Sequence, residues 1–385
     1  MHSHHVFRRD TLSHASRSEL RADPHPALER EGGHRCGAPR DPLPGKRLRQ
    51  LLETAPFREG WRHPREGAEH MGVDHGHRLG CRALLIRMKP SALFAAVALL
   101  ATACAGAPGP APTNATVGSI KLASWNMEHL AERNGSGCRP RSEADYAAMR
   151  AYVDDLGADV IAFQEVESTP AAQRVFDPEI YTVVIEDRVG TDRGGECRGQ
   201  EGLTINAQRT GFAVRNGIAF DRQPDFTAVQ AGNPDLRSGV DLIVRPRGGE
   251  PIRVLSVHLK SGCSSGNSNE ACPVLFQQVP IMEGWIDERT TEGVRFAVLG
   301  DFNRRLAMPG DAVWADWDDA SPANADLALA SGDQSAGCDP RYRDFIDFIV
   351  LDRRATADLR GFNEKTFEGE GLSDHCAVSA SLSLG

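Results

Sequence analysis

The sequence predicts an α/β fold for residues 119–385, and three observations support this prediction. Short apolar runs of strand length recur along this part of the chain, bounded by Gly, Pro or polar residues. Residues 143–156 and 276–289 instead place apolar side chains at helical spacing. The predicted elements lack the regular βαβ rhythm of a Rossmann sheet, and neither GxGxxG nor GxxxxGK[ST] occurs. A mixed α/β domain without a nucleotide phosphate loop is therefore expected.

The predicted strands and helices follow one another along residues 120–384. Residues 120–126 alternate apolar and polar side chains, as a half-buried strand does. The helix at residues 143–156 is closed by Gly157, and a buried run at residues 159–165 ends on a carboxylate. The remaining predicted elements are strands at 181–185, 211–214, 240–244, 252–259, 345–350 and 377–384, a helix at 276–289, and loops at 188–208 and 307–342.

The stretch from residue 296 to Asn303 is the most informative. Residues 296–299 form a short apolar run typical of a buried strand. We expect Gly300 to end it, so that the backbone turns or approaches a ligand. A carboxylate such as Asp301 can orient water or hold a cation, and the amide of Asn303 can donate to a developing oxyanion. The same residues also fit an Asx turn after a core strand.

Acids and amides recur at the ends of the predicted strands, where a scaffold carries its chemistry. Magnesium prefers hard oxygen ligands, usually one or two carboxylates completed by water and substrate phosphate. Of the three histidines beyond residue 104, His258 and His375 stand at such ends. Asp347 lies in an apolar strand and needs a partner if buried, for which a histidine is suitable. The strand-end set is Asn126, Glu128, Glu165, Asp301, Asn303 and Asp374.

Six motifs in order resemble those of the endonuclease/exonuclease/phosphatase superfamily, the DNase I-like fold. They extend from about residue 120 to residue 384. They are Trp125-Asn126, Gln164-Glu165, His258-Leu259-Lys260, Gly300-Asp301-Phe302-Asn303, Ile346-Asp347-Phe348-Ile349 and Ser373-Asp374-His375. The resemblance implies a two-sheet α/β sandwich flanked by helices, in four layers, with the site at one edge of the sheets. It also implies hydrolysis of phosphodiesters with Mg²⁺ or Mn²⁺.

The resemblance assigns a metal-binding role to one group of residues. Glu165 would hold the divalent ion with Asn126 beside it, and Asp374 would complete the metal shell. Glu128 matches a second acid on the metal side that some branches of the superfamily have.

The remaining matched residues would act on the substrate. Asp301 would orient the attacking water, and Asn303 would stabilise the pentacoordinate phosphorus. His375 would contact the scissile phosphate with Asp347 behind it. His258 would be the second phosphate-contacting histidine, as in the nuclease and sphingomyelinase branches. Lys260, which follows in the same motif, would either neutralise phosphate charge or be a solvated lysine at a strand end.

A non-specific endonuclease is the first function expected, with nucleic acid as its partner. The charge of the chain argues against it, because nucleic-acid binding normally needs a basic surface. Residues 1–87 hold 16 Lys and Arg and 11 Asp and Glu, a net charge of +5; the whole chain is −9, so residues 88–385 carry −14. A local basic patch would be supplied by Arg139 with Arg141, Arg188 with Arg193, or Arg304 with Arg305.

Three other functions remain open. A phospholipid or sphingolipid phosphodiesterase, binding a lipid head group, would fit a membrane tether. Such enzymes often carry an exposed aromatic hairpin, for which Trp314 and Trp317 are the candidates. A small phosphoester phosphatase is the next possibility, and an inactive surface-binding module the last, since every expected chemical residue is present. No protein partner is inferred.

The first 118 residues are expected to lie outside the catalytic domain. Residues 1–87 form a disordered extension or mistranslated upstream sequence. Residues 88–103 resemble an export signal, with a positive flank, an apolar run and small residues before Cys104. Ordinary cleavage after Ala103 would release a secreted protein, but because Cys104 lies where acylation would need it, a periplasmic or cell-surface lipoprotein is the first expectation. Residues 104–118, rich in Ala, Pro and Gly, would then be a flexible tether.

Six cysteines follow Cys104, and an even number in an exported domain favours disulfides. Cys263 and Cys272 flank a small polar loop and are the first pair expected; Cys138 with Cys197 is the second. No Cys-x-x-Cys spacing of a zinc site occurs among the six.

Overall fold

The computed structural model describes residues 117–188, 194–369 and 372–385, which all belong to one compact unit, Val97–Gly385. The expectations for the extension, the export signal and the tether through Cys104 concern residues outside the described ranges. Within those ranges, no helix has both the length and the apolar character needed to span a membrane.

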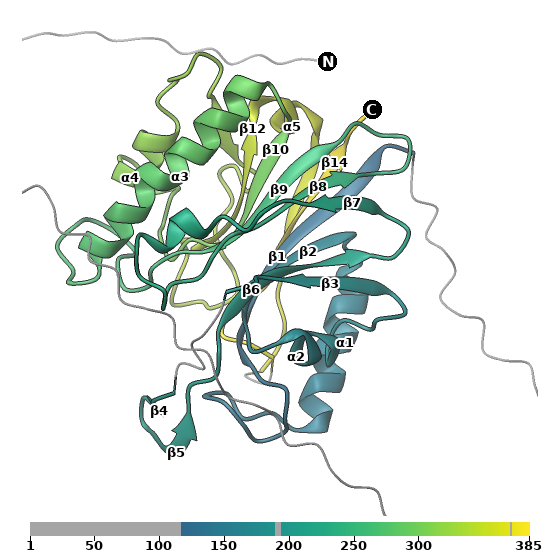
Figure 1. Ribbon diagram of the computed structural model, residues 1–385, viewed down its shortest axis with the longest axis vertical. Helices are drawn as coiled ribbons and strands as arrows, with labels where there is room; N and C mark the ends of the chain where they lie inside the picture. Colours follow the sequence, from purple (N-terminus) through teal and green to yellow (C-terminus); the bar gives the residue numbers. More distant parts are fainter. Residues whose placement is uncertain (1–116, 189–193, 370–371) are drawn as a thin grey trace, which may run out of the picture. The chain divides into compact units, whose positions relative to one another are not determined.

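Two mixed sheets form the centre of the described part (Figure 1). In the first sheet the order is β13 (Leu359–Lys365), β14 (Ala377–Ser383), β1 (Ser119–Leu130), β2 (Val160–Val166), β6 (Arg209–Arg215) and β3 (Tyr181–Ile185). In the second it is β11 (Leu327–Leu329), β12 (Asp347–Asp352), β10 (Phe296–Asp301), β9 (Ile252–His258), β8 (Val240–Arg245) and β7 (Ala219–Arg222). A small hairpin pairs β4 (Glu196–Cys197) with β5 (Gln200–Thr204).

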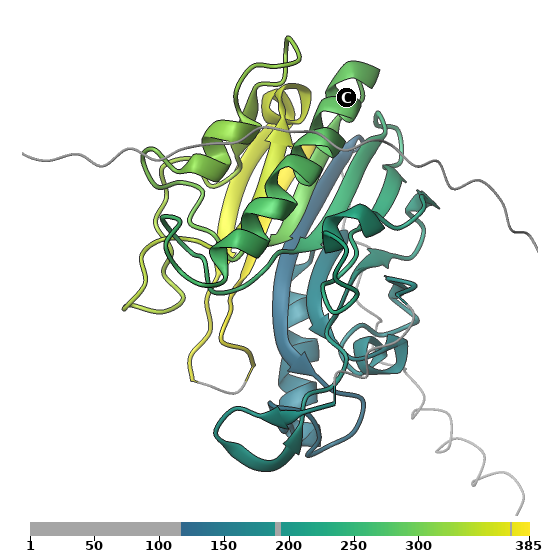
Figure 2. The same cartoon turned by 60° about the vertical axis from the view of Figure 1, so that its left-hand side comes forward.

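Helices cover the outer faces of both sheets, which confirms the predicted two-sheet α/β fold. The long helix α3 crosses the outer face of the second sheet (Figure 2). The first sheet is covered by α1, which begins with a capping box between Ser142 and Asp145 and ends at Gly157 in the left-handed conformation. The helices are α1 (Glu143–Leu156), α2 (Thr169–Gln173), α3 (Cys272–Glu292), α4 (Ala312–Trp317) and α5 (Arg353–Asp358), with a 3₁₀ turn at Thr227–Gln230.

The alternation of side chains along β1 determines what faces the second sheet. Leu122 belongs to the core between the sheets, whereas Trp125 packs into the core under α1. By the same alternation Asn126 points toward the second sheet, where its amide reaches Asp301. The expectation of a half-buried strand was wrong here, because both faces of β1 are covered.

Several predicted boundaries shift because neighbouring strands extend them. β10 continues through Gly300 to Asp301, which pairs with Asp347, so Asp347 begins β12 rather than lying inside it. A Cβ on Gly300 would lie 2.0 Å from the carbonyl oxygen of Val257 on β9. The close approach that requires glycine is therefore to a neighbouring strand, not to a ligand. The expected loop 307–342 contains α4 and β11.

Both expected disulfides are present among the described residues, between Cys263 and Cys272 and between Cys138 and Cys197. The remaining two cysteines form a third, between Cys338 and Cys376. Since Cys376 follows His375 directly, this bond ties a loop of the second sheet to the histidine motif.

Candidate active site

The strand register brings the predicted site residues to one end of the sandwich. β1 runs parallel to β2, and β9 runs parallel to β10, so in each pair the carboxyl ends meet at one edge. His258 lies opposite Asp301, which in turn lies opposite Asp347 on the antiparallel strand β12.

Asp301 is at the centre of this cluster and is 2% exposed. Its Oδ2 accepts a hydrogen bond from Asn126 Nδ2 at 3.0 Å and lies 3.5 Å from His258 Nε2 and 4.0 Å from His375 Nε2. Its Oδ1 accepts the backbone N–H of Asn303 at 2.8 Å. Burial raises the pKa of Asp301, the charge of Asp347 raises it further, and His375 opposes both. These surroundings therefore make Asp301 a stronger proton acceptor than an ordinary aspartate.

His375 is held from both sides. Its Nδ1 lies 2.7 Å from Asp347 Oδ2, and since an ionised carboxylate only accepts, Nδ1 donates this hydrogen bond. The indole N–H of Trp125 donates to the backbone carbonyl of His375 at 3.0 Å. Burial alone would lower the pKa of His375, but Asp347, with a smaller contribution from Asp301, raises it well above the ordinary value. The Asp347 carboxylate therefore favours the protonated form of the imidazole, whose Nε2 lies 4.0 Å from Asp301 Oδ2.

Glu165, at the end of β2, forms the other side of the cluster. Its Oε2 accepts the backbone N–H of His129 at 3.2 Å, and its Oε1 lies 3.8 Å from His258 Nε2. Asn126 accepts the backbone N–H of Glu128 through Oδ1 at 3.0 Å. These bonds fix the orientation of the Glu165 carboxylate and the Asn126 amide while leaving oxygen lone pairs for a further ligand.

Glu128 and Asp374 lie beside each other next to this group. Burial raises the pKa of Glu128 and the charge of Asp374 adds to it, whereas Arg139, whose Nε is 3.3 Å from Glu128 Oε2, lowers it. The side chain of Asp374 is 66% exposed, with Oδ1 at 3.7 Å from His375 Nε2. Asp374 is thus the more accessible of the two carboxylates.

Strained backbone is concentrated at the same place. Glu128, His129, Glu165 and Asn303 have φ of 41°, 53°, 60° and 52°, among the seven non-glycine residues with positive φ in the described ranges. Each costs on the order of 1–3 kcal/mol and persists only where the surroundings enforce it.

The donor set on the Glu165 side suits a divalent cation. Glu165, Asn126 and Asp374 offer carboxylate and amide oxygens, the hard ligands that Mg²⁺ prefers. Asp301, Asp347 and His375 also place possible ligand atoms within 4.8 Å of one another. In that second group the atoms are already engaged, His375 with Asp347 and Asp301 with two asparagines, so it resembles a proton-transfer network more than a metal cage.

Two of the arginines suggested for a basic patch, Arg188 and Arg304, are buried. Arg304 is buried, ion-paired with Asp311 at 2.7 Å and bonded to loop carbonyls, so the expectation that it reaches phosphate was wrong. Arg188 is buried against Glu186, and Arg193 lies outside the described residues. The guanidinium groups of Arg188 and Arg304 bind buried carboxylates and backbone carbonyls. The position of an arginine in the sequence does not predict such partners.

Two other candidates, Arg141 from the suggested basic patch and Trp317 from the suggested aromatic hairpin, are buried and have structural roles. Arg141 is buried and donates to the carbonyls of Met127, Glu128 and Leu372, so it braces the loop behind the metal-side residues. Trp317 is fully buried, which removes it as an exposed aromatic.

Lys260, Asn303 and His129 also make contacts close to the candidate site residues. Lys260 Nζ donates to the carbonyl of Ser261 at 2.7 Å. Asn303 Nδ2 donates one hydrogen to the carbonyl of Leu259 at 3.2 Å, which leaves its second hydrogen for another acceptor. The ring of His129 lies 3.6 Å from Glu165 Oε2 and within 3.3 Å of Gln208 Nε2, a role that its place after Glu128 had not suggested.

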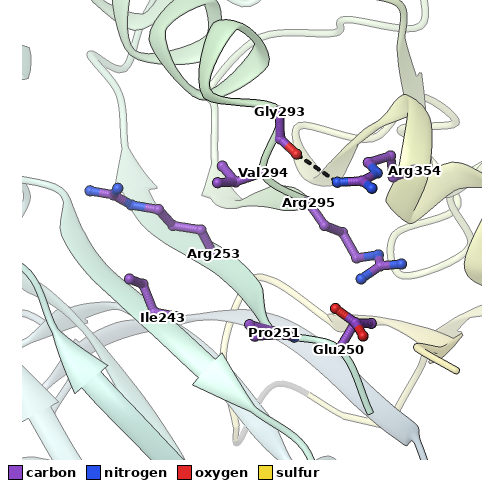
Figure 3. Close-up of a pocket in the computed structure, with 8 residues that line it drawn as sticks. All are labelled: Ile243, Glu250, Pro251, Arg253, Gly293, Val294, Arg295 and Arg354. Atoms are coloured by element: carbon purple, nitrogen blue, oxygen red, sulfur yellow. Dashed lines mark hydrogen bonds between the residues drawn. The ribbon is translucent and has the colours of Figure 1, made fainter.

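A pocket of about 300 Å³ lies at the opposite ends of the same strands (Figure 3). Arg253 near the start of β9 and Arg295 just before β10 line it, whereas His258 and Asp301 end those strands. Arg253 pairs with Asp241 and Arg295 with Asp358, and Arg354 donates to the carbonyl of Gly293 that closes α3. The arginines therefore hold structure together, and we do not assign the site to this pocket.

The two facing sheets and the cluster of acids, amides and histidines at one edge define the class of α/β phosphoesterases to which the motifs pointed. A comparison with protein families matches residues 123–375 to the Endonuclease/Exonuclease/phosphatase family. The chain belongs to this family, and the predicted resemblance is confirmed. Membership supports a phosphoesterase, and hence hydrolase, activity; enzymes of the family generally use a divalent metal ion. A search of curated proteins found no match.

Solved structures with a similar chain include truncated Caenorhabditis elegans TDP2, at 16% identity, covering 69% of this chain and 98% of that one, with a TM-score of 0.47. The human nocturnin catalytic domain with bound sulfate is 16% identical, with 70% and 96% covered and a TM-score of 0.45. The AP endonuclease LMAP from Leishmania major is 14% identical, with 69% and 88% covered and a TM-score of 0.46.

Proposed function

We propose that the chain is an exported, metal-dependent phosphodiesterase, and that it acts as a non-specific endonuclease on nucleic acid. The observation that carries the proposal is the position of Asp301 Oδ2, buried between Asn126 Nδ2, His258 Nε2 and His375 Nε2. A carboxylate aimed at two imidazoles and braced by an amide fits general-base chemistry on water beside a phosphate.

Each group has a step in this proposal. Asp301 takes the proton of the attacking water, which its raised pKa favours near neutral pH. His375 carries a proton at Nε2 and, held by Asp347 at Nδ1, donates it toward a phosphate oxygen or the leaving group. His258 Nε2 lies 3.5 Å from Asp301 Oδ2, and the remaining amide hydrogen of Asn303 would donate to a phosphate oxygen.

A divalent ion such as Mg²⁺ or Mn²⁺ would be held by Glu165, Asn126 and Asp374, with Glu128 behind them beside Arg139. When bound, it would neutralise charge on the phosphate oxygens. Backbone N–H groups orient Glu165 and Asn126, so their oxygens would be held in place for the ion before it binds.

Export is proposed on separate grounds. Three disulfides occur among the described residues, and disulfides persist mainly in oxidising compartments. Mass spectrometry of the protein purified from its host would show whether Cys104 is acylated, as in a surface lipoprotein, or is the first residue of a secreted form.

The substrate is tested with the full chain on four phosphoesters: plasmid DNA, sphingomyelin vesicles, bis(p-nitrophenyl) phosphate and p-nitrophenyl phosphate. Each is incubated with Mg²⁺, with Mn²⁺ and with EDTA. We expect metal-dependent nicking of plasmid and hydrolysis of the small diester. Hydrolysis of the vesicles or of the monoester in place of plasmid would replace the endonuclease by a lipid phosphodiesterase or a phosphatase.

A further inference from the structure

An exposed aromatic side chain interrupts the polar surface near the site. The segment Arg341-Tyr342-Arg343, here named the RYR strip, is exposed throughout. Tyr342 is 55% exposed, and the other large hydrophobic residues that are exposed among the described ones are Val117 and Met308. The guanidinium of Arg341 lies 5.5 Å from the centre of the Tyr342 ring. An aromatic ring with a guanidinium beside it differs from an apolar patch that would enter a lipid surface.

Three links hold the RYR strip at the edge of the candidate site. The disulfide between Cys338 and Cys376 ties its loop to the residue after His375. Arg305 Nε, two residues after Asn303, lies 3.7 Å from Asp344 Oδ2. The third link is a backbone hydrogen bond of 2.9 Å from Phe302 N–H to the carbonyl of Ile346. The strip is therefore fastened to both the Asp301 motif and the His375 motif.

The strip also offers a cation that the protein does not use internally. Within the described ranges, no acidic oxygen lies within 4.0 Å of the Arg343 side chain, whereas Arg341 pairs with Asp339 of its own loop at 2.6 Å. Arg141 and Arg304, by contrast, are buried and bonded to backbone carbonyls. Arg343 is available for a phosphate group.

We propose that the RYR strip binds an unpaired nucleotide of the substrate, with the base stacked on Tyr342 and a neighbouring phosphate against Arg343. This inference rests on the proposed endonuclease function and narrows it to single-stranded or locally unpaired nucleic acid. Stacking on an aromatic side chain needs a base face that a duplex keeps covered, and it contributes about 1–3 kcal/mol per base.

The test compares four variants of the full chain: Tyr342→Ala, Tyr342→Phe, Arg343→Gln and Arg360→Gln. Arg360 is an exposed arginine at the start of β13, and it serves as the matched control. KM and kcat are measured on a single-stranded oligonucleotide, its duplex and bis(p-nitrophenyl) phosphate. Tyr342→Ala should raise KM for the single strand about 5- to 150-fold, the equivalent of one lost stack. Tyr342→Phe, which keeps the ring, and Arg360→Gln should leave that KM unchanged.

The salt dependence of KM distinguishes the contribution of Arg343 from that of the Tyr342 ring. Arg343→Gln should reduce the slope of log KM against log salt for the single strand by about 0.7, the contribution of one phosphate contact. All four variants should hydrolyse bis(p-nitrophenyl) phosphate as the wild type does, because that diester is too small to span the strip and the site.

An unchanged KM for the single strand in Tyr342→Ala, with the wild type cleaving it, would overturn the inference and leave the endonuclease proposal standing. Equal losses on the oligonucleotide and the small diester would also overturn it, since the tyrosine would then support the site itself. A wild type that cleaves the small diester but no oligonucleotide would instead refute the endonuclease function. Sphingomyelin vesicles are assayed in parallel with the same variants, and a loss confined to the vesicles would overturn the inference and assign the strip to a lipid surface.

Discussion

The two ends of the sandwich use the same strands for different purposes. At the end formed by Arg253, Arg295 and Arg354, each arginine meets an acid or a carbonyl. At the other end of these strands, Asp301 is buried between His258 and His375 and near a second carboxylate, Asp347. The first end shows charges placed to hold strands together, and the second shows charges placed so that their protonation is perturbed.

Backbone conformation differs in the same way. Two turns at the far end place glycine, Gly248 and Gly293, where positive φ carries little strain. At the site end Glu165 and Asn303 adopt positive φ with full side chains, at a cost that glycine would avoid. At Glu165 and Asn303 the strained backbone conformation therefore carries a side chain of the candidate site.

Among the substitutions that test this comparison, Asp301→Asn should have the largest effect on the rate of hydrolysis. Asp301→Asn keeps the shape but removes the proton acceptor, so hydrolysis of bis(p-nitrophenyl) phosphate should fall about 10²- to 10⁴-fold. Thermal unfolding should show that the variant remains folded, because burial of an ionised carboxylate is no longer required. Turnover within a few-fold of wild type would remove Asp301 from the mechanism.

Asp347→Asn should have a smaller effect with a recognisable pH signature. Hydrolysis requires Asp301 ionised and His375 protonated, so activity is lost as pH falls through the first pKa and as pH rises through the second. Asp347 raises both pKa values, and its neutralisation should move both limbs of the pH–rate profile to lower pH, with a fall in rate of about 10²-fold. Limbs that stay in place would show that Asp347 does not act through His375.

Substitution of glycine by alanine should change the free energy of unfolding in opposite directions in strand β10 and in helix α3. Gly300→Ala brings a methyl group to 2.0 Å from the Val257 carbonyl and should destabilise the fold by at least about 1–3 kcal/mol, as overpacked cores do. Gly284→Ala in α3 meets nothing within 4 Å and should stabilise by about 0.5–1 kcal/mol. Denaturant unfolding measures both; equal effects would mean that β10 tolerates separation from β9.

The smallest effect is expected at the far end. Arg354→Gln removes the hydrogen bond to the carbonyl of Gly293 and should lower the free energy of unfolding by at most about 1 kcal/mol. Its hydrolytic rate should equal that of wild type. A marked loss of activity would show that the pocket in Figure 3 belongs to the function after all.

Much of the fold was predictable because strands of this protein are apolar runs with polar ends. Residues 181–185 and 143–156 match β3 and α1, since local patterns and caps determine both. The strand ends were less accurate, because Asp301 and Asp347 are held in strands by pairing with each other, which a local pattern does not reveal.

The site was predictable as a set of residues but not as a set of contacts. Order along the chain indicated Glu165, His258, Asp301 and His375, and the structure brings them within about 4 Å of their neighbours. The sequence did not separate Arg304, which is buried, from Arg305, because their difference arises from Asp311 and the loop carbonyls. Tyr342 was missed because its loop has no periodicity from which exposure could be inferred.

The most direct test of the central claim is hydrolysis of bis(p-nitrophenyl) phosphate as a function of Mg²⁺ concentration, for wild type and Glu165→Gln. If the strand-end oxygens converge on a divalent ion, wild-type activity should saturate with Mg²⁺ and vanish in EDTA. The variant should then need at least about tenfold more Mg²⁺ for half-maximal rate, as losses of metal-site residues typically require. A rate that ignores Mg²⁺, or the same half-saturation in both proteins, would contradict the account.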